Sequence, residues 1–439
     1  QAAPEAAAQA APEAAPRALQ VLPGRLSGRV EVPPSKSMGH RALIAAALAA
    51  GTEGLRDVRG ASPDTSRDIR ATWNALVRMV PEGVAALRSG HRTREGSEPA
   101  SPGGRIECDC DESGSTLRFL VPLAAALGLS VDFTGRGRLP LRPLDAYFQL
   151  FADKGVTLSA PPGRSLPLQV SGTLRPGVFE LPGDISSQYV SGLLMALPLL
   201  SGPSRIRLLS PLESAPYVDM TLAVLREFGV FAERLTDGYD VPGNQRYLRV
   251  PYAVEGDYSQ AAFWLAARHL GSDLEVLGLE PASFQGDRAI LGLLRAYREA
   301  AGAPGAGSRD LVLDASQIPD LVPILAVVAA YHPGRTRIEK AARLRLKESD
   351  RLSAIRDALA AIGAEIRETE DGLVVEGGRP LRGGVVDTRQ DHRIAMAMAV
   401  AALGTREGVV LRDPGCVAKS YPDFFDEWRR LGGSLHGIN

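Results

Sequence analysis

Basic and hydroxyl side chains recur where this sequence changes from a polar turn to a run of small apolar residues. Lys36 and Arg41 stand at such a point in "PPSKSMGHRALIAAALAAG", and Arg118 stands at another in "ESGSTLRFLVPLAAALG". The stretch "DISSQYVSGLLMALPLL" places Ser187 there, and "DHRIAMAMAVAALG" places Arg393. Arginine can grip a phosphate or carboxylate with two parallel hydrogen bonds, and lysine supplies a mobile point charge. These residues therefore indicate a site for a substrate that carries several negative charges.

The elements that must position these residues form a pattern repeated along the chain. A short alternating strand, a polar turn and an Ala-rich apolar helix recur at intervals of about 63 to 78 residues, which indicates a repeated supersecondary unit and an α/β fold. The N-terminus of a helix attracts anions, so a basic side chain there opposes the helix dipole unless an anion is bound. The alternative is a structural repeat of six ordinarily capped helices. The six turns lie near Lys36, Gly114, Ser187, Asp257, Asp320 and Asp391.

Composition excludes several other classes of protein. The 439 residues carry 50 basic and 51 acidic side chains, so no global field attracts nucleic acid or a membrane surface. No apolar run reaches the roughly 18 residues of a membrane span. Cys108, Cys110 and Cys416 lack the spacing of a zinc site, so we expect no metal, no cofactor, no disulfide and a cytoplasmic location. Residues 1–19 are rich in Ala and Pro, and we expect a flexible leader.

The turns and several other segments resemble the 5-enolpyruvylshikimate-3-phosphate synthase family, over roughly residues 20–435. The resemblance implies a two-domain inside-out α/β barrel built from six βαβαββ-type repeats, three in each domain. It places residues 20–34 and 252–439 in a first domain and residues 35–251 in a second, with chain crossings near Pro34 and within residues 251–257. The segments that carry it are "PPSKSMGHRAL", "ESGSTLRFL", "TGRGRLPLRP", "DISSQY", "SAPYVDMT", "EGDYSQAAF", "QIPD", "RLRLKESDRL", "DHRIAMA" and "DPGCVAKSYPDFF".

The reaction that the resemblance implies transfers the enolpyruvyl group of phosphoenolpyruvate to the 5-hydroxyl of shikimate 3-phosphate and releases phosphate, in the shikimate pathway to chorismate and the aromatic amino acids. The residues that it places around phosphoenolpyruvate are Lys36, Gly114, Arg138, Gln188, Arg351, Arg393 and Lys419. Those that it places around shikimate 3-phosphate are Lys36, Ser37, Arg41, Ser186, Ser187, Gln188, Ser214, Tyr217, Asp320 and Lys347.

The chemistry needs proton transfer at the methylene carbon and at the hydroxyl. We expect Glu348 to serve the carbon and Asp320 to serve the hydroxyl, with Lys36 sharing that role. The alternatives are a surface ion pair between Glu348 and Arg351, and a simple helix cap for Asp320. We expect His392 to lie near the phosphate without being an essential base. For Arg118, direct contact with a ligand and a place behind the ligand both stay open.

Some residues depart from the family pattern. Glu112 places an acid beside an anionic ligand, and Arg343 stands where a substrate-binding Asn is common. In this family glyphosate competes with phosphoenolpyruvate; Gly114 leaves room for it, although Glu112 and Ser115 alter the neighbourhood. The rival activities are transfer to UDP-N-acetylglucosamine, whose enzymes carry a Cys that "TGRGRLPLRP" lacks, and an inactive or RNA-end-processing relative. We expect a monomer that acts on small molecules, with no nucleic-acid or membrane partner.

Overall fold

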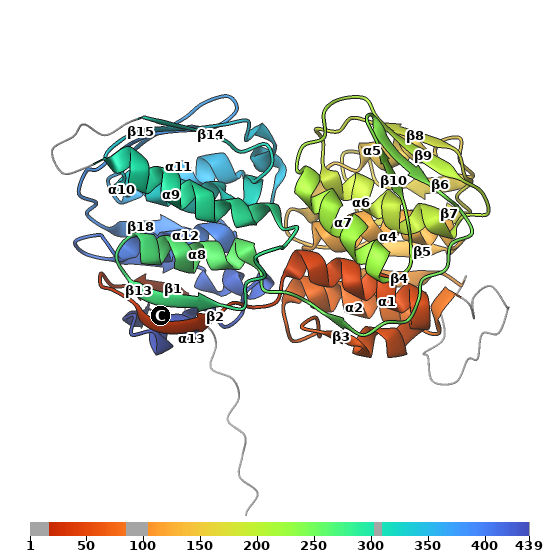
Figure 1. The fold of residues 1–439 in the computed structure, drawn as a ribbon, viewed down its shortest axis with the longest axis horizontal. Coiled ribbons are helices and arrows are strands. Elements are labelled where there is room, and N and C mark those ends of the chain that lie inside the picture. The colour runs from red at the N-terminus through yellow and green to blue at the C-terminus, as the bar shows by residue number, and fades with distance from the viewer. Residues whose placement is uncertain (1–16, 85–103, 303–309, 439) are drawn as a thin grey trace, which may run out of the picture.

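Residues 17–84, 104–302 and 310–438 are described by the structure, which is a computed structural model (Figure 1). The chain forms two domains that lie side by side. The first domain contains the blue and teal part of the chain together with the red N-terminal strands, and the second contains the orange to yellow-green part. Each domain has its own cluster of buried apolar side chains.

Within its described residues, the second domain contains three sheets. Its strands are β3 (Val58–Arg59), β4 (Ile106–Asp109), β5 (Val131–Thr134), β6 (Val156–Ser159), β7 (Leu168–Gly172), β8 (Val178–Leu181), β9 (Ser204–Leu208), β10 (Glu233–Leu235), β11 (Gly238–Val241) and β12 (Tyr252–Ala253). They are ordered β4-β5-β7-β6, β10-β11-β9-β8 and β12-β3. Its helices are α1 (Lys36–Arg56), α2 (Arg67–Met79), α4 (Gly114–Ala126), α5 (Asp145–Phe151), α6 (Ser187–Ala196) and α7 (Ala215–Glu227).

The first domain repeats this arrangement. Its strands are β1 (Ala18–Val21), β2 (Ser27–Glu31), β13 (Asp273–Leu277), β14 (Leu311–Asp314), β15 (Gly334–Glu339), β16 (Glu365–Glu368), β17 (Leu373–Gly377), β18 (Gly384–Asp387), β19 (Val409–Arg412) and β20 (Leu435–Ile438). They are ordered β14-β15-β17-β16, β18-β19-β1-β20 and β13-β2. Its helices are α8 (Tyr258–His269), α9 (Ile290–Ala301), α10 (Val322–Tyr331), α11 (Arg351–Ala361), α12 (His392–Ala402) and α13 (Phe424–Arg430).

All four four-stranded sheets have the same pattern, one parallel pair followed by two antiparallel pairs. In the last sheet the N-terminal strand β1 takes the third position, antiparallel to both β19 and β20. The first and fourth units form only the two-stranded sheets β12-β3 and β13-β2 within the described residues. Among the described residues, four of the six predicted repeats therefore show the full four-stranded sheet.

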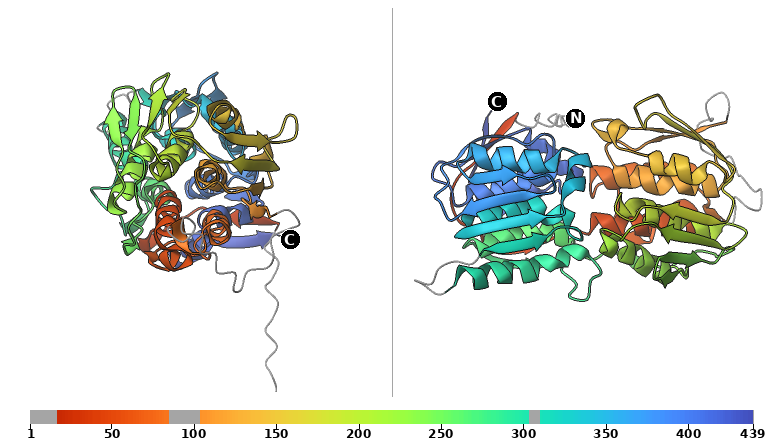
Figure 2. Two further views of the ribbon diagram at one scale, coloured as in Figure 1. Left: turned by 90° about the vertical axis from the view of Figure 1, so that its right-hand side faces the viewer. Right: turned by 90° about the horizontal axis from the view of Figure 1, so that it is seen from above.

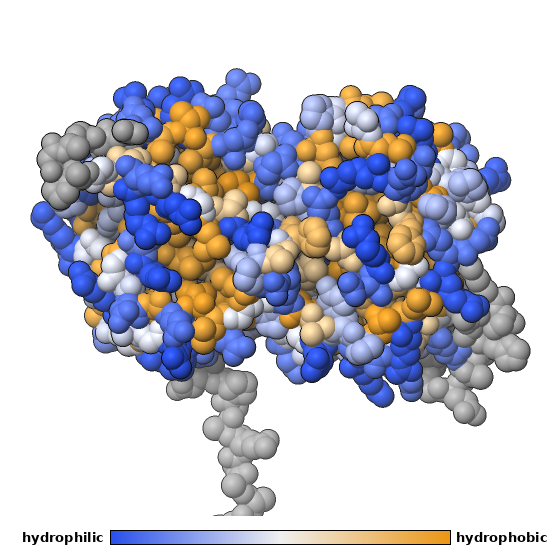
Figure 3. Space-filling view, viewed as in Figure 1, coloured by the Kyte–Doolittle hydropathy of each residue, from blue (hydrophilic) through white to orange (hydrophobic). Residues whose placement is uncertain are grey.

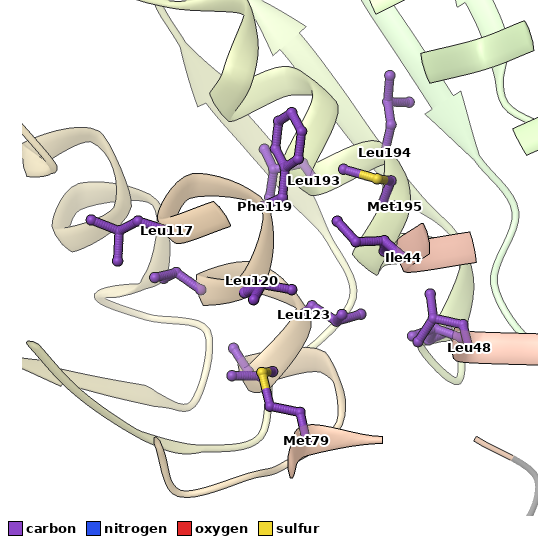
Figure 4. Close-up of a cluster of buried hydrophobic side chains, with 14 of the residues drawn as sticks. Ile44, Leu48, Met79, Leu117, Phe119, Leu120, Leu123, Leu193, Leu194 and Met195 are labelled. Carbon is purple, nitrogen blue, oxygen red and sulfur yellow. The ribbon is translucent and has the colours of Figure 1, made fainter. Parts of the chain in front are cut away.

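The helices that follow the polar turns lie inside the domains, and the sheets cover them. Every residue of α12 is buried, and so are the residues of α10 from Val322 to Ala330. A helix can be buried on all sides only if it is apolar on all sides, which explains the long runs of Ala, Val, Leu and Met. Figure 4 shows this packing in the second domain, where Ile44 of α1, Leu123 of α4 and Met195 of α6 lie near one another.

Two chain segments cross between the domains next to each other. Pro34 and Gly256 form an isolated antiparallel bridge, and the amide of Ser35 donates to the carbonyl of Glu255. Residues 252–253, next to the predicted boundary before residue 252, form β12 and pair with β3. An edge strand of two residues gives no periodic signal in the sequence.

The N-terminal prediction needs correction at its end. Most of the predicted leader, residues 1–16, lies outside the described residues. Ala18 and Leu19, however, belong to β1, where Leu19 and Val21 are buried against the sheet's inner face. None of the helices in the described ranges combines the length and the apolarity that crossing a bilayer requires.

Candidate active site

The predicted site residues converge on a cleft between the two domains, at the N-termini of the inner helices. Figure 2 (right) shows the inner helices of both domains running toward the boundary between them. On the face shown in Figure 3, hydrophilic and hydrophobic residues are interspersed over both domains up to this boundary. The predicted residues that line the cleft are Lys36, Ser37, Arg41, Gly114, Ser186, Ser187, Gln188, Ser214, Tyr217, Asp320, Lys347, Glu348, Arg351 and Arg393.

Small polar residues cap these helices, which leaves the basic residues available to a ligand. The side chains of Ser35, Ser113 and Ser186 accept from backbone amides at the starts of α1, α4 and α6. Asp257 and Asp391 do the same for α8 and α12. The helix dipoles therefore direct partial positive charge toward one cleft, which favours anions.

Asp320 is surrounded by cations. Its Oδ1 accepts from Arg351 at 2.9 Å, and its Oδ2 accepts from Arg393 at 2.9 Å. Lys347 Nζ lies 3.8 Å from Oδ1. Burial opposes ionisation, but the charges of Arg393, Lys347 and Arg351 outweigh it and hold the pKa of Asp320 well below its ordinary value. The hydroxyl of Tyr217, from the other domain, donates to Oδ2 at 3.1 Å.

Glu348 contacts the second terminal nitrogen of the Arg351 guanidinium, whose first terminal nitrogen contacts Asp320. Its Oε2 accepts from Arg351 at 2.6 Å, and its Oε1 lies 3.9 Å from Arg142 Nη1 across the domain boundary. The side chain of Glu348 is only 13% exposed, so the predicted alternative of a solvated surface ion pair does not apply. Although burial opposes it, the charges of Arg351, Lys419 and Arg142 depress the pKa of Glu348 strongly.

Arg142, which the sequence did not single out, takes the place predicted for Arg138. Arg138 is exposed and lies outside the cleft, whereas Arg142 is 8% exposed and lines it. The short 3-10 helix Leu139–Leu141 lies between them and turns the chain toward the site. A Cβ atom on Gly114 would lie 2.5 Å from Arg142 Nη1, so the glycine leaves room for the guanidinium as well as for a ligand. Nothing in the local sequence "TGRGRLPLRP" indicates which of the two arginines faces the cleft.

Asp68 is a second residue that the sequence analysis missed. It lies on α2, is buried, and accepts from Lys36 Nζ at 2.7 Å, which orients the lysine toward the cleft. Despite burial, the charges of Lys36 and Lys419 lower its pKa. Its only signal in the sequence is the Asp in the first turn of an amphipathic helix, which is common in helices without a site.

Lys419 and Glu112 form another contact across the domain boundary, with Nζ 3.4 Å from Oε2. Lys419 is 5% exposed and lies close enough to Glu348 to depress its pKa. The acid that departs from the family pattern is thus paired with a predicted substrate-binding lysine. This contact between the domains compensates the charge of Glu112 at the edge of the site.

Gln188 is held by hydrogen bonds to two neighbours. Its Oε1 accepts from Arg118 at 2.9 Å, and its Nε2 donates to Ser115 at 2.9 Å. Arg118 lines the cleft, and it also donates to the carbonyl of Pro143. Ser186 is the N-cap of the helix that carries Gln188, and Ser187 is the first residue of that helix.

Two further residues have defined surroundings. Arg41 donates to Thr221 and to the carbonyls of Ser37 and Tyr217, so it ties α1 to α7 beside the cleft. His392 is fully buried, and neither ring nitrogen finds a hydrogen-bond partner among the described residues. Burial, then the charges of Lys36 and Arg393, hold its pKa well below the ordinary value, so the ring is neutral at pH 7.

The site holds carboxylates, among them Asp320 and Glu348, in contact with arginines and lysines drawn from both domains. Within the ranges that the structure describes, no three His, Cys, Asp or Glu side chains are grouped as metal ligands. This arrangement can neutralise a polyanion by side-chain cations and helix N-termini, and can move protons with carboxylates.

Solved structures that share this fold include two enolpyruvyl transferases. The EPSP synthase from Acinetobacter baumannii matches with a TM-score of 0.74 at 23% identity, covering 95% of this chain and 99% of that one. The enolpyruvyl transferase NikO from Streptomyces tendae matches with a TM-score of 0.68 at 18% identity, covering 96% and 98% of the two chains.

Sequence comparison defines the family more closely. The family model for EPSP synthase (3-phosphoshikimate 1-carboxyvinyltransferase) matches residues 22–428. The 3-phosphoshikimate 1-carboxyvinyltransferase of Clostridium acetobutylicum is 42% identical over 424 residues, which are 95% of this chain and 98% of the relative. The enzyme of the same name from Clostridium beijerinckii is 41% identical over 94% and 97% of the two chains. The chain belongs to the EPSP synthase family.

Proposed function

We infer that this protein is a 3-phosphoshikimate 1-carboxyvinyltransferase, which transfers the enolpyruvyl group of phosphoenolpyruvate to the 5-hydroxyl of shikimate 3-phosphate and releases phosphate. The observation that carries this is the cleft in which two buried carboxylates, Asp320 and Glu348, share Arg351. Both substrates are polyanions, and this site supplies their countercharge from side chains of both domains.

Two groups of residues hold the substrates in this proposal. Gly114, Gln188, Arg351, Arg393, Lys419 and Lys36 surround phosphoenolpyruvate, with Arg142 in place of Arg138. Ser37, Arg41, Ser186, Ser187, Ser214, Tyr217 and Lys347 hold shikimate 3-phosphate. In the first domain, the segments just before α10 and α11 carry Asp320 and Glu348. In the second domain, the starts of the inner helices carry most of the hydroxyls, so closure of the domains assembles the site.

Glu348 exchanges a proton with the methylene carbon of phosphoenolpyruvate. In the unliganded protein the cations around Glu348 keep it ionised. When the carboxylate and phosphate of phosphoenolpyruvate neutralise Arg142, Arg351 and Lys419, the pKa of Glu348 rises and the group can be protonated. It can then donate to the carbon during addition and take a proton back during elimination.

Asp320 is the base for the 5-hydroxyl. It is ionised at neutral pH and can accept a proton immediately. Lys36 is oriented by Asp68 and stabilises negative charge as the phosphate leaves. We propose that the protein acts as a monomer in the reducing cytoplasm, which suits its buried free cysteines.

The test is phosphate release from phosphoenolpyruvate with shikimate 3-phosphate as acceptor, and with UDP-N-acetylglucosamine as the competing acceptor. Shikimate 3-phosphate should support release and the nucleotide sugar should not. Activity should persist in excess EDTA, because the proposed countercharge is entirely protein. The assignment would be contradicted if only the nucleotide sugar supported phosphate release, or if neither acceptor supported it.

A further inference from the structure

Asp287 is a buried carboxylate behind the cleft to which the mechanism above gives no role. It belongs to the 3-10 helix Gly286–Ala289 and is 4% exposed. Within the described part of the chain, Lys347, Arg351 and Arg393 all form ion pairs with Asp320 and none with Asp287. Arg351 also pairs with Glu348 and Asp391. Its Oδ1 makes no hydrogen bond of normal geometry to any described residue. A buried carboxylate without a close cation is costly and tends to hold a proton instead.

The hydroxyl of Tyr217 connects this carboxylate to Asp320. Tyr217 lies in the first turn of α7, in the second domain, whereas both carboxylates belong to the first. Its oxygen lies 3.1 Å from Asp320 Oδ2 and 3.4 Å from Asp287 Oδ2. A phenol both donates and accepts hydrogen bonds, so the three groups form a continuous path for a proton.

The surroundings of the two carboxylates give Asp287 a higher proton affinity than Asp320. Burial, and then the charge of Asp320, raise the pKa of Asp287 to about 7; Asp257 adds to the rise, and Arg393 and the Ser259 hydroxyl oppose it. Three cations do the reverse at Asp320 and make it a weak proton acceptor. Two neighbouring carboxylates with such different proton affinities commonly mark distinct acid and base roles.

We propose that Asp287 stores the proton that Asp320 removes from the acceptor hydroxyl, with the Tyr217 hydroxyl as the bridge. The inference rests on the proposed function, because it takes Asp320 as the base at that hydroxyl. Asp287 does not touch the substrate and acts through Tyr217.

The proton transfers balance without any further reactant. As the O–H bond of the 5-hydroxyl breaks, its electron pair forms the new bond to the enolpyruvyl carbon and the proton passes to Asp320. Tyr217 takes this proton while its own passes to Asp287, which leaves a neutral tyrosine and an ionised Asp320. When the phosphate leaves in the second step, the reverse transfer returns the proton through Asp320 to the departing phosphate.

The experiment compares Asp287→Asn, Tyr217→Phe, the double variant and the wild-type protein in the phosphate-release assay between about pH 5.5 and 9. Asn can still accept a hydrogen bond from Tyr217 but cannot take up its proton. Wild-type kcat should rise with pH through about 7, as Asp287 loses its proton and becomes able to accept one. Each single variant should lose about 10²-fold in kcat, the low end for a positioned proton-transfer group, and should lack that rise. The kcat of the double variant should be no lower than that of the less active single variant, because Asp287 and Tyr217 act on one path.

A purely structural role gives different results. It would raise KM or lower the melting temperature of Asp287→Asn while leaving the pH profile of kcat as in the wild type, and it would overturn the proposal. If Asp287→Asn does not fold, Tyr217→Phe decides, since an unchanged pH profile of kcat in that variant also overturns it. Asp314→Asn is the control, because this exposed carboxylate pairs with Lys340 away from the cleft. Absence of phosphate release by the wild-type protein would instead refute the proposed function.

Discussion

At the scale of single residues, the proton affinity of each acidic group in the site depends on the cations that it contacts. Asp320 contacts Arg351 and Arg393, and Glu348 contacts Arg351 and approaches Arg142. In the proposed function, substrate anions compete for the same cations, so binding would change the proton affinity of each carboxylate. Variants that keep shape but remove the titrating group should therefore affect turnover more than binding.

Glu348→Gln and Asp320→Asn should fail in different ways. Each should lower kcat by about 10²- to 10⁴-fold, the usual range for a positioned acid or base. In Glu348→Gln, exchange of the methylene protons of phosphoenolpyruvate with solvent deuterium should fall in step with kcat, since that exchange requires protonation of the carbon. When the tetrahedral intermediate is added to Asp320→Asn, its breakdown to product should be impaired less than kcat of the forward reaction. Normal kcat at saturation with raised KM in both variants would show that these carboxylates only position substrates.

Lys347 should make substrate binding depend on pH in the alkaline range. Burial lowers its pKa to about 8, only partly offset by Asp320, so the side chain is charged below that pH and neutral above it. The KM for shikimate 3-phosphate should therefore rise as pH increases from about 7.5 to 9, because a countercharge for the phosphate is lost. Lys347→Gln should have a high KM that does not change over this range. A wild-type KM that stays constant to pH 9 would contradict the role of Lys347.

At the scale of elements, the start of α4 shows how helix geometry and a neighbouring side chain share one space. Ser113 caps the helix by accepting from the amide of Thr116, and Gly114 is the first helical residue. The Arg142 guanidinium occupies the space next to the missing Cβ. Any side chain at residue 114 must displace this cation from the position that we propose for phosphoenolpyruvate.

Gly114→Ala should therefore weaken binding without loss of the fold. The new methyl group would meet the flexible end of Arg142 at 2.5 to 2.9 Å, which the arginine can relieve by moving. We expect the inhibition constant of glyphosate to rise more than the KM for phosphoenolpyruvate, both measured by steady-state phosphate release. Gly292→Ala is a matched control in a helix, with open space around the new Cβ, and should change neither constant. Equal increases in both constants would mean that space at residue 114 does not distinguish the two ligands.

At the scale of the whole molecule, the two adjacent crossings and the contacts across the cleft set how the domains meet. Pro34 and Gly256 pair where the chain passes between domains. Arg343 of the first domain lies 3.2 Å from Glu213 of the second, and Lys419 pairs with Glu112. The arginine that stands where the family commonly has a substrate-binding Asn thus contributes to the contact between domains.

Gly256→Ala should disturb this junction. A Cβ there would lie 2.2 Å from the carbonyl oxygen of Gly278 and 2.7 Å from a methyl group of Val32, and a backbone neighbour cannot move aside cheaply. Overpacking of this kind costs about 1–3 kcal/mol of unfolding free energy. Denaturant unfolding should show this loss, and the KM values of both substrates should rise because the domains no longer meet in the same way. Gly24→Ala is the control, because its Cβ would have no neighbour within 4 Å, and it should match the wild type. Wild-type stability and KM values in Gly256→Ala would show that the crossing tolerates the distortion and would contradict this prediction.

The sequence by itself determined the repeated unit, the inner helices and most of the cleft. Apolar periodicity and capping are local properties, so the helices starting at Lys36, Gly114, Ser187 and His392 could be predicted from the residues that form them. Lys36, Arg41 and Arg393 were recognisable because a basic residue at a helix start opposes the dipole unless an anion is bound. The family resemblance then indicated which reaction these residues serve.

The tertiary structure decided the contacts between residues that are distant in the chain. Only folding shows that Arg142, and not Arg138, reaches the cleft, because a three-residue helical turn determines which arginine points inward. Only folding brings Tyr217 of one domain between Asp287 and Asp320 of the other, 70 and 103 residues away. Proton affinity in a buried site depends on burial and on charges supplied by such distant segments, and neither is encoded in local sequence.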